Sequence, residues 1–169
     1  KITYRPETLW GFNFDGGLYI GTGTSNIVLW GFNIFWSGIT ARVNTNNNLF
    51  TGGITEFGQG NAILHNIIGN TGHSGIGSWS STAGKHIAGN IIRFIGADDS
   101  VNYTPGVPSA AGSAMYLQND EGSPEALISG NITYFNYTTG MKAYGNEDIY
   151  GFSFTHNITA DNGGAGIFY

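Results

Sequence analysis

The sequence has no cysteine among its 169 residues, which excludes disulfide bonds, thiolate zinc sites and cysteine nucleophiles. Charged side chains are also scarce, at 10 % of the chain, and the six lysines and arginines form no cluster. Nucleic acid is therefore not an expected partner, because binding it requires a basic patch. No apolar run approaches the roughly 20 residues of a membrane-spanning helix, so no membrane span is expected either.

Glycine, aromatic residues and β-branched residues are abundant instead. The chain has 28 glycines and 14 % aromatic residues, a mixture that favours short strands joined by tight turns. Apolar residues make up 40 % of the chain, which is enough for a packed core, so disorder is not expected. Helical periodicity is absent over any useful length.

Two short patterns alternate along the chain. The first is an apolar pair, a small or polar residue, then Asn-Ile; it stands at residues 63–67, 87–91, 128–132 and 154–158, with a looser copy at 28–32. The second is Gly followed by an apolar residue, at 17–18, 53–54, 75–76, 140–141 and 166–167, with Ala114-Met115 in the same slot. Internal repetition of this kind is typical of solenoid folds.

The spacing of the repeated asparagines sets the architecture. Successive copies lie 24, 41 and 26 residues apart, and a period in the twenties corresponds to one coil of a parallel β-solenoid. We therefore predict an all-β fold, a right-handed parallel β-helix of about six coils, forming a single domain over residues 1–169. Two loop insertions, at about 41–52 and 98–112, should leave the helix at the same corner. Neither end shows a cap, so we expect open ends or an excerpt of a longer chain.

The repeated asparagines are expected to be structural. An asparagine in a turn can bond to the backbone of the next coil and build a ladder along the axis. The predicted ladder consists of Asn66, Asn90, Asn131 and Asn157.

Alternation along the second pattern predicts an aromatic face. The residue after each glycine should point inward, and the next residue, with the one two further on, should point outward. An exposed aromatic strip suits a glycan, because ring faces pack on the C–H faces of sugars. The predicted polysaccharide-binding residues are Tyr19, Phe57, Trp79, Tyr116, Gln118 and Tyr144.

The candidates for catalysis are weaker. Carboxylates cluster at Asp98 and Asp99 and at Asp120 and Glu121, where they could form an acid–base pair or, for the second cluster, a Ca²⁺ site. Lys142 is the one cation on the predicted face. The strand between the two clusters separates them by about 16 Å, so solvated turn carboxylates are the favoured interpretation. No cofactor is expected, with Ca²⁺ left as the alternative.

Several segments resemble bacterial right-handed parallel β-helix repeat proteins, a pectate-lyase-like family of unassigned reaction. They read HNIIGNTGHSGIGSW at 65–79, MYLQN at 115–119, SGNITYFN at 129–136 and GMKAYG at 140–145. The resemblance implies a secreted or surface solenoid whose relatives include polysaccharide lyases, epimerases and hydrolases. Two departures are the loop 107–114, where such proteins are rich in His, and Lys142, where they often carry His.

Two functions from different classes follow. The first is an extracellular or cell-surface module that binds polysaccharide on the aromatic face without catalysis. The alternative is a structural subunit whose open ends stack into an extracellular filament, since unpaired strand edges are templates for pairing and head-to-tail contacts do not close. A polysaccharide lyase, epimerase or hydrolase ranks below both.

Overall fold

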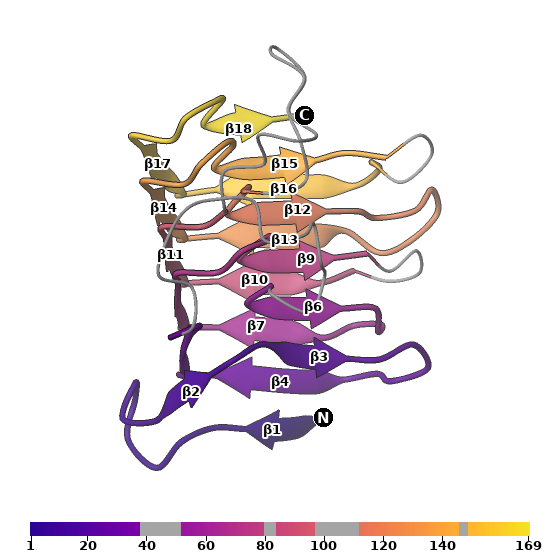
Figure 1. Cartoon of the computed structure of the whole chain (residues 1–169). Coiled ribbons are helices and arrows are strands. Elements are labelled where there is room, and N and C mark those ends of the chain that lie inside the picture. Colours follow the sequence, from indigo (N-terminus) through magenta and orange to yellow (C-terminus); the bar gives the residue numbers. More distant parts are fainter. Residues whose placement is uncertain (38–51, 80–83, 97–111, 146–148) are drawn as a thin grey trace.

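The computed structural model describes residues 1–37, 52–79, 84–96, 112–145 and 149–169. These residues form no helix and eighteen short strands, which lie in three parallel sheets of six strands each (Figure 1). Consecutive strands visit the first, second and third sheet in turn, so every three strands form one rung and six rungs stack along an axis. The predicted parallel β-helix of about six coils is confirmed.

The strands of each sheet pair in register with the strand three positions earlier and later in the chain. The first sheet contains β1 (Ile2–Tyr4), β4 (Ile27–Trp30), β7 (Ala62–Leu64), β10 (His86–Ala88), β13 (Ala126–Ser129) and β16 (Phe152–Thr155). The second contains β2 (Asn13–Asp15), β5 (Asn33–Phe35), β8 (Ile67–Gly69), β11 (Ile91–Arg93), β14 (Ile132–Tyr134) and β17 (Ile158–Ala160). The third contains β3 (Leu18–Ile20), β6 (Ile54–Glu56), β9 (Ile76–Ser78), β12 (Met115–Leu117), β15 (Met141–Ala143) and β18 (Ile167–Phe168).

The core is a set of inward stacks that run along the axis. In the second sheet, Ile34, Ile68 and Ile92 are paired in register and fully buried. In the third sheet, the apolar residue of the second pattern is buried in the middle rungs, at Ile54, Ile76, Met115 and Met141. Because equivalent slots repeat at about 4.8 Å, identical apolar residues pack on one another and fill the interior.

The corner between the first and second sheets explains the first sequence pattern. The residue before each repeated Asn has a positive φ, for example 55° at His65 and 64° at Gly89. This left-handed conformation favours glycine and penalises most other residues. The alternation of small or polar residues at this slot therefore follows from the turn that each coil must make.

The repeated asparagines form a continuous ladder behind that corner. Asn90 accepts hydrogen bonds at Oδ1 from the backbone N and the Nδ2 of Asn66, at 2.9 and 3.0 Å. It donates through Nδ2 to Asn131 Oδ1 and to Ile63 O, both at 2.9 Å. Asn131 in turn donates from its backbone N and its Nδ2 to Asn157 Oδ1, at 2.9 and 3.0 Å. The ladder thus satisfies buried backbone groups that neither sheet can reach.

The two long connections both join the second sheet to the third, between β5 and β6 and between β11 and β12. The insertions expected at about 41–52 and 98–112 fall in these connections and so leave the same corner. Apart from residues 52 and 112, both insertions lie outside the described residues, as do the candidate carboxylates Asp98 and Asp99.

Candidate functional site

The outward face of the third sheet carries one aromatic ring on each rung. Neighbouring ring centroids lie 4.3 to 6.5 Å apart, so the rings form one uninterrupted column, called the aromatic ladder here. Spacings of this size are those of interacting aromatic pairs. From the first rung to the sixth, the ladder consists of Tyr19, Phe57, Trp79, Tyr116, Tyr144 and Phe168.

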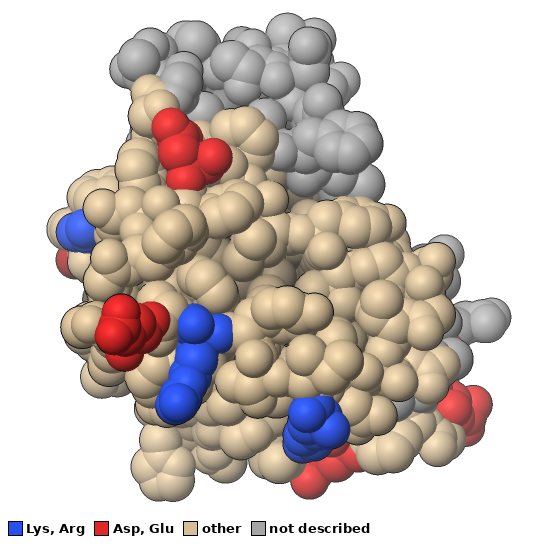
Figure 2. Space-filling model, turned by 90° about the horizontal axis from the view of Figure 1, so that it is seen from below, with Lys and Arg blue, Asp and Glu red and all other residues tan. Residues whose placement is uncertain are grey.

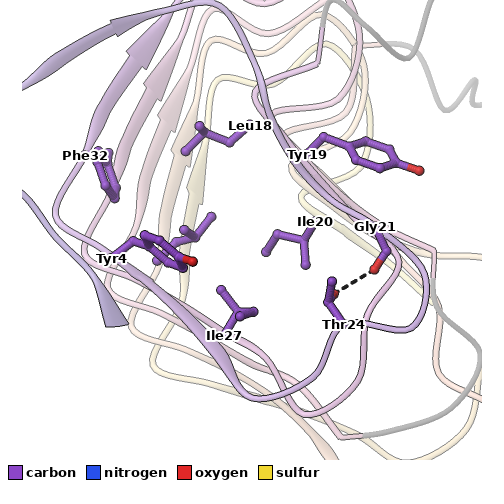
Figure 3. Close-up of a pocket in the computed structure, with 9 residues that line it drawn as sticks. Tyr4, Leu18, Tyr19, Ile20, Gly21, Thr24, Ile27 and Phe32 are labelled. Carbon is purple, nitrogen blue, oxygen red and sulfur yellow. Dashed lines mark hydrogen bonds between the residues drawn. The ribbon is translucent and has the colours of Figure 1, made fainter. Parts of the chain in front are cut away.

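The rings of this column differ in exposure. Tyr19 is 65 % exposed and Tyr144 is 50 % exposed. Figure 3 shows Tyr19 pointing away from the interior, while Leu18 and Ile20 on either side of it point inward. Phe57 and Trp79 are half-buried. The ladder therefore presents ring surface to solvent at several places rather than along its whole length.

The expectation that Tyr116 is exposed is wrong, because only 6 % of it is accessible. The predicted side-chain direction is right, since its inward neighbours Met115 and Leu117 fill the core. Outward direction does not give exposure here; among the described residues, the Tyr116 ring centroid lies 4.3 Å from that of Trp79 and 6.3 Å from that of Tyr144. Tyr116 therefore acts as a packed centre for the ladder.

Lys142 points outward from the third sheet, yet only 2 % of it is exposed. Its Nζ lies 4.3 Å from the centroid of the Tyr144 ring and 5.8 Å from those of Tyr116 and Phe168. Burial lowers the pKa of Lys142, because it penalises the charged form. Ring faces stabilise an ammonium group at these distances, so Lys142 helps to fix the rings of the upper ladder.

The Trp79 side chain lies where the outward residue of its rung, Gly77, has no side chain. A Cβ placed on Gly77 would lie 2.7 Å from Trp79 Nε1. That buried nitrogen has no hydrogen-bond partner among the described residues. The neighbouring His73 ring is buried, and this burial lowers its pKa, so the uncharged form is favoured beside the indole.

Gln118 supplies the polar group of the ladder. Its Nε2 lies 3.4 Å from both Tyr116 Oη and the carbonyl oxygen of Tyr144. These long contacts tie the fourth rung to the fifth and place an amide beside exposed ring surface. A sugar hydroxyl at this position would meet both a donor and an acceptor.

The described carboxylates do not converge with this ladder into a metal site. Asp120 and Glu121 lie in the turn after β12, where Ser123 N donates to Asp120 O at 3.1 Å, and Glu121 is exposed. Within the described ranges, no three His, Asp or Glu side chains gather closely enough to hold a metal ion. The remaining candidates, Asp98 and Asp99, lie outside those ranges.

A buried ion pair was not predicted from the sequence. Lys85 Nζ lies 3.3 Å from Glu56 Oε2, and the two side chains are 3 % and 1 % exposed. Ser78 Oγ donates to Glu56 Oε2 at 2.6 Å and Asn61 Nδ2 donates to Oε1 at 2.9 Å. The alternation of side chains along a strand could have predicted that Glu56 points inward, because it lies two residues after the inward Ile54. Lys85 Nζ also donates to Gln118 O at 3.2 Å, so the pair ties neighbouring rungs together, which indicates a structural role.

Comparison of the chain with protein-family models, with curated proteins and with solved structures found no match. In the parts of the chain that the structure describes, no helix is long and apolar enough to cross a membrane.

Proposed function

We propose that this protein is an extracellular or cell-surface module that binds polysaccharide along the aromatic ladder without transforming it. The observation that carries the proposal is the unbroken column of six rings, which leaves Tyr19 and Tyr144 well exposed. Four strand spacings, or about 19 Å, separate these two residues. A linear polymer lying along the axis would contact both, whereas a single small molecule would not.

The chemistry of the ladder favours binding over catalysis. Its side chains offer ring faces for the C–H faces of sugars, with the Gln118 amide beside them for hydroxyl groups. The one ammonium group, on Lys142, is packed among three rings. General acid–base catalysis needs a proton donor and acceptor within reach of the scissile bond. The described ladder residues supply affinity and not such a pair.

Replacing Tyr19 or Tyr144 with alanine is expected to weaken polysaccharide retention about 3- to 10-fold each, from a loss of about 0.5–1.5 kcal/mol per ring contact. Affinity gel electrophoresis against a panel of soluble neutral and acidic polysaccharides measures the effect. The matched control is Tyr150→Ala, because Tyr150 is 45 % exposed but lies outside the ladder.

Equal retention of the parent protein, both single variants and the double variant would overturn the proposal. Size-exclusion chromatography measures the length of any retained glycan over time. A decrease in that length would overturn the part of the proposal that excludes catalysis. Tyr116→Ala is not a suitable test, since removing a buried ring would also destabilise the fold.

A second candidate function is end-to-end self-association, and an apolar hollow of about 310 Å³ at the end of the solenoid favours it. Figure 3 shows inward side chains of the first and second rungs around this hollow, among them Leu18, Ile20 and Ile27. Seen from that end, the centre of the molecule carries no charged side chain (Figure 2). The inward Ile167 of the sixth rung is likewise 46 % exposed.

The occupant that this second candidate requires is another copy of the chain. Each rung already pairs with the next through the same three parallel sheets, so the sixth rung of one copy could continue that contact beneath the first rung of another. Such head-to-tail contact does not close and produces filaments.

Ile167→Asp is expected to abolish rods that the parent protein forms at high concentration, because it places a carboxylate in the new interface. Electron microscopy and sedimentation velocity measure this. The control is Ile158→Asp, since Ile158 is 57 % exposed on the same rung but points outward. Single particles of the parent protein at every concentration, or rods that Ile167→Asp leaves intact, would exclude end-to-end assembly.

A further inference from the structure

The outward face of the second sheet, away from the aromatic ladder, contains a hollow of about 200 Å³. It lies over β8, the third strand of this sheet in chain order, between β5 and β11. A cavity of roughly 150 Å³ already accommodates one benzene ring, so a single six-membered ring fits here. The hollow is lined by Phe35 and Gly69 with Arg93, Phe94, Asn33 and Asn70.

Gly69 creates this hollow. Phe35, Gly69 and Arg93 are paired in register on neighbouring strands, so their side chains would form one outward column. The missing side chain leaves a slot between Phe35 and Arg93, which are two strand spacings, or about 9.6 Å, apart. The backbone does not demand glycine, since a Cβ at Gly69 would lie 3.4 Å from Arg93 O and 3.8 Å from Arg93 Cγ. The slot therefore depends on the choice of side chain.

Arg93 is held at the edge of the slot by an aromatic cluster. Its guanidinium carbon lies 5.6 Å from the centroid of the Phe94 ring. The Phe94 ring is stacked on that of Phe135, with centroids 5.9 Å apart and planes 14° apart. No described carboxylate forms an ion pair with Arg93. A guanidinium that stacks on a ring keeps its hydrogen-bonding edge available for a ligand.

The backbone at Phe94 makes the left-handed turn that recurs at this corner of the solenoid. Phe94 has φ 55°, and the equivalent corner residues Asn70, Phe135 and Asp161 have φ 51°, 53° and 48°. Asparagine tolerates this left-handed conformation, whereas a bulky residue pays about 1–2 kcal/mol. Because the conformation repeats from rung to rung, it follows from the turn that each coil makes at this corner. Here it places the ring against which Arg93 is oriented.

We propose that this hollow binds a carboxylate carried on a single six-membered ring. The ring would enter the slot over Gly69 and pack against Phe35, while the carboxylate would accept paired hydrogen bonds from the Arg93 guanidinium. Asn33 and Asn70 line the rim, where their Nδ2 groups donate to Asn13 Oδ1 and to Trp36 O, each at 2.7 Å. The site is separate from the aromatic ladder, so it does not depend on the proposed polysaccharide binding.

Titration of the isotope-labelled protein with sodium benzoate and with sodium glucuronate, followed by amide NMR shifts, tests this proposal. The two probes distinguish a planar aromatic acid from a uronic acid, and benzamide and glucose are their uncharged counterparts. At least one acid is expected to shift the amide signals of Gly69 and Arg93 saturably, at least tenfold more tightly than its uncharged counterpart. No saturable shift with either acid, or equal binding of the uncharged counterparts, would overturn the proposal.

Two variants locate the site without disturbing the core. Gly69→Val fills the slot with a side chain that strands favour, and Arg93→Gln removes the charge; each is expected to weaken acid binding at least tenfold. The matched control is Ala160→Val, because Ala160 is an exposed outward residue in the same column at the far end of the sheet. Acid binding that survives Gly69→Val, or is lost equally in Ala160→Val, would overturn the assignment.

Discussion

Replacing Lys85 with methionine is expected to lower the free energy of unfolding by about 3–5 kcal/mol, the cost of leaving a buried charge without its partner. The variant keeps much of the lysine stem but removes the ammonium group that lies 3.3 Å from Glu56 Oε2. Glu56 is then 1 % exposed with only neutral hydrogen-bond donors, Asn61 and Ser78. Urea denaturation followed by circular dichroism measures the loss.

The double variant Glu56→Gln with Lys85→Met separates the charge from the packing. A glutamine keeps the shape of Glu56 and can still bond to Asn61 and Ser78, but it carries no buried charge. The double variant is therefore expected to be more stable than Lys85→Met alone, giving a coupling free energy above about 1 kcal/mol. Lys1→Met, at an exposed position, should change stability by no more than about 0.5 kcal/mol. Additive effects of the two interior substitutions would show that the ion pair contributes nothing specific.

The sequence predicted the fold well because the backbone demands of each coil recur at fixed positions. Each coil needs a left-handed turn residue followed by an asparagine, as at Gly89 and Asn90 or His156 and Asn157, and both demands are visible as letters. A second ladder, in which Asn136 Nδ2 donates to Asn162 Oδ1 at 2.8 Å, went unpredicted. Its members are 26 residues apart, the same separation as Asn131 and Asn157, so the signal was present.

The candidate site was less predictable, because exposure depends on contacts between coils. Alternation within a strand gives the direction of the Tyr116 and Lys142 side chains correctly. It does not report which side chains of neighbouring rungs pack against Tyr116, such as those of Trp79 and Tyr144. The rule that inward slots are apolar also fails at Glu56 and Lys85, where two charges from different rungs neutralise each other. Such pairing is invisible until the register of the coils is known.

Replacing Asn90 with alanine is expected to cost about 3–6 kcal/mol of unfolding free energy. The substitution leaves the Asn66 backbone N and Nδ2 without their acceptor and Ile63 O without its donor, all inside the solenoid. Each buried polar group without a partner costs about 1–3 kcal/mol. For a domain with a typical free energy of unfolding of about 5–15 kcal/mol, this loss is a large fraction of the total. Thermal and urea unfolding measure the effect.

Asn90→Asp tests whether the ladder works through both halves of the amide. An aspartate at this position can still accept from Asn66, but it cannot donate to Ile63 O or to Asn131 Oδ1 and sets oxygen against oxygen. We therefore expect Asn90→Asp to be destabilising although it keeps the size of the side chain. Asn13→Ala, at an exposed position that only accepts from Asn33, should change stability by less than about 1 kcal/mol. Equal stability of the parent protein and Asn90→Asp would mean that packing alone, and not the directed hydrogen bonds of the ladder, aligns successive coils.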